Sequence, residues 1–360
     1  MDKPFSLILD LSRFLAALLV FFHHAEQHLK DPRLSALASF GHDAVIFFFI
    51  LSGFVIAYVT EHKEKTLAGY ATARLARLYS VTLPSLLLAY GLFEVGSRLL
   101  PGHYAIPDNL TWGETLLTST FFLNRFLDYQ EGIPTNAPYW SICYEAWYYV
   151  LFGAAFYLKG LQRLLVVAVA ALVAGFNILL LMPIWLLGFA CYRHQHRLPR
   201  SPLVGTLLVA GALGAYLWMR VTNFDDRLFI FTAHYFGGEQ AINASLHFSK
   251  RFLPDFVIAV LFVTLFAGLH ILRAQLWPVL SRAQKAIQKS ASHTFALYLF
   301  HSPVLLFLAG YSDNSLLVMA LCLAVAVAVG HVTEQQKPRL AALIGRWLAA
   351  PRSRSAATTA

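Results

Sequence analysis

The chain has 360 residues, of which 58% are hydrophobic and only 13% are charged. Soluble globular proteins carry roughly 25% charged residues, so this composition excludes an ordinary soluble protein. The net charge of +9 does not indicate nucleic-acid binding, because the basic residues punctuate the apolar stretches and form no separate basic arm. Cys143, Cys191 and Cys322 are spaced for neither a zinc site nor a disulfide framework.

Long apolar segments follow one another along the chain without the alternation typical of barrel strands. Crossing the hydrocarbon core takes roughly 20 residues of helix, and only helices or closed barrels satisfy their backbone groups there. We therefore predict an all-α, polytopic integral membrane protein with about ten transmembrane helices. The fifth and sixth spans are short and are expected to form a tight pair, bent at Gly175–Asn177 and Pro183. The expected spans are 8–28, 43–60, 79–97, 138–158, 163–178, 180–192, 202–219, 253–272, 291–309 and 315–333.

The basic residues are divided unevenly between the two sides of these spans. With the N-terminus in the cytoplasm, 20 of the 28 Lys and Arg residues fall inside. Lys and Arg collect on the cytoplasmic side of membrane proteins, so both termini are expected there. A membrane domain is expected over 1–338 and a cytoplasmic tail over 339–360, with a short amphipathic helix at Leu340–Leu348. The eight outside residues are Lys30, Arg33, Arg98, Arg125, Arg220, Arg227, Lys250 and Arg251.

Arg13 and His24 are the two candidate residues of the first span, because ionisable side chains are expensive to place in a membrane. Eleven positions apart on a helix, they share one face and are separated by about 16 Å. Taken singly, Arg13 also fits a snorkelling anchor and His24 a hydrogen-bonded packing residue. His28 lies one turn after His24, but without a third protein ligand in view we expect no metal site.

Two short patterns follow. Ser52 and Gly53 interrupt the apolar second span, where small residues also serve close helix packing. Arg74 and Arg77 share a helix face at the expected cytoplasmic edge, where two guanidinium groups can grip phosphate. The alternative for both arginines is plain positive-inside anchoring.

Polar residues also lie deep in the fourth and ninth spans. Ser141, Glu145 and Tyr148 follow the spacing i, i+4, i+7 and are expected to line one helix face. A carboxylate at the depth of Glu145 must be paired or protonated, and pairing with an arginine is one alternative. His301 is a second deep imidazole, and Pro303 after it frees a backbone carbonyl. Asp255, near the end of the eighth span, is a further candidate.

Together these motifs resemble the membrane-bound acyltransferase-3 family, which includes O-antigen and exopolysaccharide acetyltransferases. The sequence departs from the family at the last span, where Glu334 and Pro338 stand four apart instead of in a Glu-x-Pro motif, which puts a role for Glu334 in doubt. The matching elements, in order, are Arg13 with His24, Phe48-Phe-x-x-Ser52-Gly53-Phe54, Arg74-x-x-Arg77, Trp140-Ser141 with Glu145, and Tyr298-x-x-His301-x-Pro303.

The resemblance implies a multi-pass protein of the bacterial inner membrane that uses cytoplasmic acyl-CoA, commonly acetyl-CoA, and modifies a carbohydrate bound for the cell surface. Arg13, Arg74 and Arg77 are expected to hold the phosphates of the donor. His24 is the expected general base, oriented by Glu145. Ser52, Tyr148 or a backbone amide is expected to stabilise the oxyanion, with Ser141 and His301 in supporting roles.

Other readings of the same residues stay open at this point. An acyl-histidine relay is a variant of the mechanism in which His24 is itself acylated. The protein is alternatively a transporter or flippase for a glycan precursor, with the buried His and Glu residues as proton relays. Inverted repeats are common in transporters, and none is visible in this sequence. The acceptor and the oligomeric state are not determined by the sequence.

Overall fold

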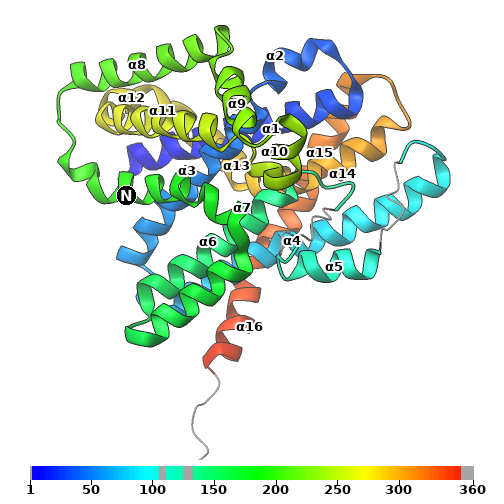
Figure 1. Ribbon diagram of the computed structural model, residues 1–360, viewed down its shortest axis with the longest axis horizontal. Coiled ribbons are helices and arrows are strands. Elements are labelled where there is room, and N and C mark those ends of the chain that lie inside the picture. Colours follow the sequence, from blue (N-terminus) through cyan, green and yellow to red (C-terminus); the bar gives the residue numbers. More distant parts are fainter. Residues whose placement is uncertain (1, 105–110, 125–132, 350–360) are drawn as a thin grey trace, which may run out of the picture.

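The computed structural model describes residues 2–104, 111–124 and 133–349, and within them the chain is helical, without strands (Figure 1). The prediction of an all-α, polytopic membrane protein is confirmed. Arg125 and the tail residues 350–360 lie outside the described part. The helices that carry the predicted site residues are α1 (Lys3–Leu29), α3 (Gly41–His62), α4 (Leu67–Leu99), α6 (Tyr139–Tyr157) and α14 (Thr294–Ala309).

The ends of α1 and α4 are set by local chemistry. The carboxylate of Asp2 accepts a hydrogen bond from the backbone N–H of Phe5, which caps the start of α1. Lys30 ends the same helix in the left-handed conformation with φ 52°. Thr66 caps α4 by accepting from the N–H of Gly69 at 3.1 Å. Both helices therefore begin at side chains that satisfy otherwise unpaired backbone donors.

Helix α3 lies directly against α7 (Gly160–His194), backbone to backbone. A Cβ atom added at Gly53 would stand 1.9 Å from the carbonyl oxygen of Trp185, and one at Gly188 would stand 1.9 Å from that of Ile50. Only glycine permits this approach at either position. The sequence pattern Ser52-Gly53 therefore serves close packing through its glycine, while its serine side chain faces the interior polar site described below.

The predicted pair of spans at 163–178 and 180–192 falls within α7, in which two helical stretches meet at a kink at Gly175. Gly175 has φ 80° and ψ 168°, a conformation that L side chains avoid, and it lies inside the segment Gly175–Asn177 where a bend was expected. After the bend, Ile178 and Trp185 pack on α6 through Tyr148 and Phe152.

The remaining helices surround this centre. Helices α8 and α11 lie side by side at one end of the molecule, and α16 packs against α4 and projects away from the helical body (Figure 1). The predicted amphipathic segment Leu340–Leu348 lies within α16. These helices are α2 (Ser35–Ala38), α5 (Trp112–Thr120), α8 (Pro202–Val221), α9 (Phe224–Tyr235), α10 (Glu239–Leu246), α11 (Phe252–Ile271), α12 (Arg273–Leu280), α13 (Gln284–Ser292), α15 (Ser315–Gln335) and α16 (Lys337–Ala349).

Seven helices of the described chain are long and apolar enough to cross a membrane, and eight if one bent pair, 273–292 with 294–309, counts as one span. The difference from the expected ten has two sources. The segment 138–158 forms α6, whose many Tyr and Trp residues lower its mean hydropathy, and α7 takes up two predicted spans. The number of spans and the N-in orientation stay predictions.

Candidate functional site

A cavity of about 70 Å³, here called the central cavity, lies among α1, α3, α4, α6 and α14. Apolar and aromatic side chains such as Phe48 and Phe295 form much of its wall. Tyr149, Thr294 and Tyr298 add hydroxyl groups. Residues that the sequence places far apart are thus brought to one site. Six of the predicted site residues line it: Arg13, Ser52, Arg74, Arg77, Ser141 and Glu145.

Glu145 is held by hydroxyl groups in the central cavity. The Ser52 hydroxyl donates to its carboxylate at 2.6 Å, and the Tyr149 hydroxyl donates to the same oxygen. The indole N–H of Trp185 in turn donates to Ser52 Oγ at 3.1 Å. Glu145 is thus fixed from α3 and from the next turn of α6. It does not orient His24, as the sequence had suggested, because its bonds go to Ser52 and Tyr149.

Arg74 and Arg77 are not equivalent. Arg74 is buried and forms an ion pair with Glu64 at 2.6 Å, with its guanidinium over the rings of Tyr70 and Tyr149 at 5.9 and 5.6 Å. Arg77 has no carboxylate at ion-pair distance within the described residues. Its guanidinium lies 5.7 Å from the ring of Phe295, and its buried Nε has no hydrogen-bond partner. The donors of Arg77 are therefore available to an anion. Arg74 gives one terminal nitrogen to Glu64, and its buried Nε, like that of Arg77, has no hydrogen-bond partner.

A second cavity of about 200 Å³, here called the basic cavity, adjoins the central cavity and shares Arg13, Arg77, Thr294 and Phe295 with it. Among the side chains that the structure describes, none in its wall is acidic, and Lys337 at the start of α16 adds a third cation. Arg13 is paired only loosely, with Asp10 at 3.8 Å. Sequence reasoning missed Lys337, since it follows the last span by a few residues. The sequence feature that could have pointed to Lys337 is its position just before the amphipathic segment Leu340–Leu348.

His24 pairs with the other deep imidazole. His24 Nδ1 lies 3.0 Å from His301 Nε2, and the ring centroids are 4.9 Å apart. His301 is fully buried and His24 is 8% exposed. Pro303 lacks an N–H, so the carbonyl of Leu299 has no helical donor. The Asn136 amide fills that place by donating to it at 3.1 Å.

Tyr298 joins the histidine pair to the central cavity. It lines that cavity, its hydroxyl lies 2.6 Å from Ser141 Oγ, and its ring centroid is 6.4 Å from that of His301. Because Ser141 Oγ also contacts the carbonyl of Pro138 at 3.0 Å, the serine donates there and Tyr298 donates to the serine. One turn of α14 thus separates the cavity from the imidazoles.

Tyr148 lies apart from this arrangement. Its hydroxyl donates to the carbonyl of Ile178 at 3.0 Å, and its side chain is fully buried between α6 and α7. The face of α6 that lines the central cavity follows i, i+4, i+8, so Tyr149 occupies the place expected for Tyr148. The expected oxyanion role of Tyr148 has no support in this position.

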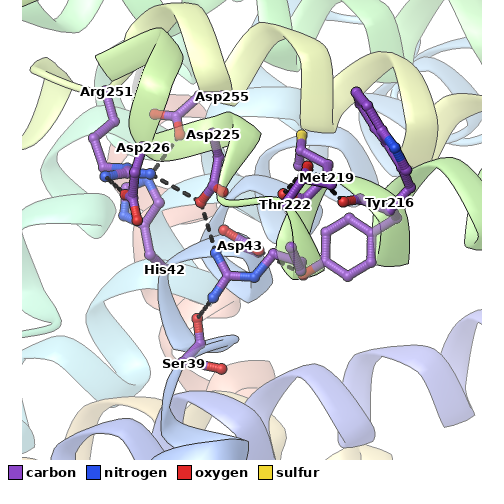
Figure 2. A network of polar contacts seen from close by, with 12 residues as sticks. Ser39, His42, Asp43, Tyr216, Met219, Thr222, Asp225, Asp226, Arg251 and Asp255 are labelled. Carbon is purple, nitrogen blue, oxygen red and sulfur yellow. Dashed lines mark hydrogen bonds and ion pairs between the residues drawn. The ribbon is translucent and has the colours of Figure 1, made fainter. Parts of the chain in front are cut away.

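A separate polar cluster, here called the Asp225 network, joins α3, α8, α9 and α11 (Figure 2). Arg220 and Arg251 both bind Asp225, at 2.7 and 3.0 Å, and Arg251 also binds Asp226 at 2.9 Å. His42 Nε2 lies 2.8 Å from the buried carboxylate of Asp255. The Tyr216 hydroxyl donates to Asp43 at 2.5 Å. The candidate Asp255 is therefore a partner of His42.

No three His, Cys, Asp or Glu side chains gather as a metal site in the part of the chain that the structure describes. His28 contacts Ser302 Oγ at 3.5 Å, a long distance for a hydrogen bond. The side chain of Glu334 lies outside the described part. The residues best placed to hold a charged co-substrate are Arg13, Arg77 and Lys337 around the basic cavity.

Comparison with known proteins adds one finding to this geometry. No curated protein and no solved structure matches the chain. The model of the acyltransferase-3 family, described as an acyltransferase domain, matches residues 7–333, which include every predicted site residue. This match favours acyl transfer over the transport alternative. The chain belongs to the acyltransferase-3 family and is a multi-pass membrane acyltransferase.

Proposed function

We propose that this acyltransferase moves a short acyl group, acetyl in particular, from cytoplasmic acyl-CoA to a hydroxyl group of an exported or cell-surface carbohydrate in the bacterial inner membrane. The assignment of the donor rests on the basic cavity, which Arg13, Arg77 and Lys337 line and whose described wall includes no acidic side chain. CoA brings several phosphate charges, and guanidinium groups bind phosphate through paired N–H donors.

The sizes of the two cavities support a placement of the donor with its phosphates in the basic cavity and its acyl group in the central cavity. The basic cavity of about 200 Å³ has room for phosphate groups, and the central cavity of about 70 Å³ has room for a short acyl group. The thin arm of the donor would run from Arg77 towards Tyr298. Arg74 then serves mainly as the structural partner of Glu64.

In the proposed reaction, His24 removes the proton of the acceptor hydroxyl as the oxygen attacks the thioester carbonyl. The C–S bond breaks, the new C–O bond forms, and the proton passes from His24 to the leaving thiolate. The products are the ester and CoA thiol, so the imidazole returns to its starting state. The Tyr298 hydroxyl lies nearest this path; to stabilise the oxyanion, its O–H would turn from Ser141 to the developing charge.

The first test is binding of acetyl-CoA to the purified protein in detergent, measured by calorimetry. We expect saturable binding that is weakened in an Arg13→Ala/Arg77→Ala variant of unchanged melting temperature. Absence of binding to acetyl-CoA and to longer acyl-CoAs, in well-folded protein, would overturn the assignment of the donor.

The catalytic assignment is tested separately with His24→Ala. We expect this variant to bind acetyl-CoA with wild-type affinity and to lose acyl transfer to cell-surface carbohydrate, measured with radiolabelled acetyl-CoA in membrane vesicles. Retained transfer would remove His24 from the mechanism.

A further inference from the structure

The two buried imidazoles, His24 and His301, are bonded in a way that fixes where their protons lie. A backbone carbonyl only accepts hydrogen bonds, so a ring nitrogen beside one must carry a proton. His301 Nδ1 lies 2.8 Å from the carbonyl oxygen of Leu297. His301 is therefore protonated on Nδ1, and as a neutral imidazole it has a lone pair on Nε2.

The same argument applies to His24 from two directions. His24 Nδ1 lies 3.0 Å from the carbonyl oxygen of Val20 and 3.0 Å from His301 Nε2. Both neighbours are acceptors, so His24 Nδ1 carries the proton and shares it between them. The lone pair of neutral His24 is then on Nε2, for which no hydrogen-bond partner is present among the described residues.

We propose that His301 is the positioning residue of His24. Its Nε2 accepts a hydrogen bond from the N–H at His24 Nδ1 and so fixes the His24 ring with Nε2 of His24 as the base. The same hydrogen bond stabilises the imidazolium formed when His24 Nε2 takes a proton. This inference rests on the proposed function, in which His24 is the general base. It assigns to a second histidine the orienting part that a carboxylate plays in catalytic triads.

The surroundings of His301 hold it rigidly for this purpose. Its side chain is fully buried, its Nδ1 is tied to its own helix, and the sulfur of Cys322 on α15 contacts its backbone carbonyl at 3.5 Å. The carbonyl left free by Pro303 is bonded by Asn136, which holds α14 against the chain before α6. Rotation of the His301 ring would break the bond to Leu297, so its Nε2 stays directed at His24.

The direct test is nuclear magnetic resonance of the full-length protein with ¹⁵N-labelled histidine rings in lipid nanodiscs. Signals are assigned by their loss in His24→Gln and His301→Gln. We expect His24 Nδ1 and His301 Nδ1 as N–H nitrogens, both Nε2 atoms as lone-pair nitrogens, and a scalar coupling across the hydrogen bond from His24 to His301. A lone pair on His24 Nδ1 would overturn the proposal whether or not the protein transfers acetyl groups.

Kinetics of three variants then separate positioning from packing. His301→Leu removes the acceptor, and kcat is expected to fall about 100-fold with the Kd of acetyl-CoA unchanged. His301→Gln keeps an acceptor oxygen and is expected to recover at least about ten-fold of that loss. His28→Gln, the control at a neighbouring histidine, is expected to keep the wild-type kcat. An unchanged kcat in His301→Leu, or a glutamine variant no better than the leucine variant, would contradict the proposal.

The two levels of inference fail in different ways. If wild-type protein neither binds nor turns over acetyl-CoA, the proposed donor is wrong, and the resonance experiment still reports the tautomer. If acetyl-CoA binds and turns over but the His24 tautomer is reversed, the donor stands and only the role of His301 is lost.

Discussion

The Asp225 network and the basic cavity are both polar clusters inside an apolar protein, but their charges are arranged differently. In the Asp225 network, Arg220 and Arg251 converge on a carboxylate that is itself only 3% exposed. Around the basic cavity, which Arg13, Arg77 and Lys337 line, the described wall includes no acidic side chain, and the buried Nε of Arg77 has no hydrogen-bond partner. A cluster whose charges are satisfied from within holds helices together, whereas one that leaves donors facing a cavity is arranged for a ligand.

The largest expected effect is at the centre of the Asp225 network. Asp225→Asn leaves Arg220 and Arg251 without their shared carboxylate, and we expect the free energy of unfolding to fall by about 2 to 3 kcal/mol. The measurement is unfolding in mixed micelles, with acetyl-CoA affinity measured in parallel and expected to be unchanged. Asp226→Asn is the matched control: Asp226 is 56% exposed, so its ion pair with Arg251 contributes little. Equal destabilisation by the two variants would refute this reading of the network.

The next effect is on ligand binding. Arg77→Ala is expected to raise the Kd of acetyl-CoA about 20-fold, or about 1.8 kcal/mol, without lowering the melting temperature. Arg98→Ala, at the far end of α4, replaces an arginine that is 77% exposed and should change neither quantity. If Arg77→Ala destabilised the protein and left acetyl-CoA binding intact, the basic cavity would be structural like the Asp225 network, and its assignment to ligand binding would be wrong.

A smaller effect is expected where a hydroxyl supports a buried acid. Tyr216→Phe removes the hydrogen bond to Asp43, which is only 3% exposed. We expect a loss of about 1 kcal/mol of stability and no change in acetyl-CoA affinity. Tyr235→Phe, on the exposed surface of α9, serves as the control. A change in donor affinity without a change in stability would show that this network also serves the ligand.

The smallest expected effect tests whether Arg74 serves mainly to pair with Glu64 while Arg77 binds the donor. Glu64→Gln removes the negative charge that holds Arg74, and we expect acetyl-CoA to bind about three-fold more tightly, close to 0.6 kcal/mol. Glu61→Gln, at an exposed position in the last turn of α3, is the control. Weaker binding in Glu64→Gln would mean that the ion pair positions Arg74 for the donor and does not compete with it.

Much of the site follows from local pattern. Helical spacing predicts that Ser141 and Glu145 share one face, and both line the central cavity. The missing N–H of Pro303 predicts a free backbone carbonyl, which is that of Leu299. The helical pattern did not predict which side chain reaches the site where the packing of a neighbouring helix determines it. Tyr148 and Tyr149 differ by one position on α6, and only the packing of α7 shows that the first bonds Ile178 while the second reaches Glu145.

The span prediction shows the same limit. The apolar stretches 163–178 and 180–192 read as two spans, because a window of hydropathy does not register whether a glycine reverses, bends or merely interrupts a helix. Gly175, inside the segment where a bend was expected, forms the kink in α7, and the expected fourth span, 138–158, is the helix α6 that contributes Ser141 and Glu145 to the site.

The sequence by itself determined that this is a helical membrane protein, which residues are too polar for their depth, and which family they resemble, because apolar length and helical periodicity are local properties of the chain. Only the tertiary structure decided that His24 meets His301 across 277 positions, that Arg74 is engaged by Glu64 while Arg77 is not, and that Lys337 joins the basic cavity. Such pairings depend on which helices touch and at what rotation, and close contacts such as Gly53 against Trp185 set that rotation between helices.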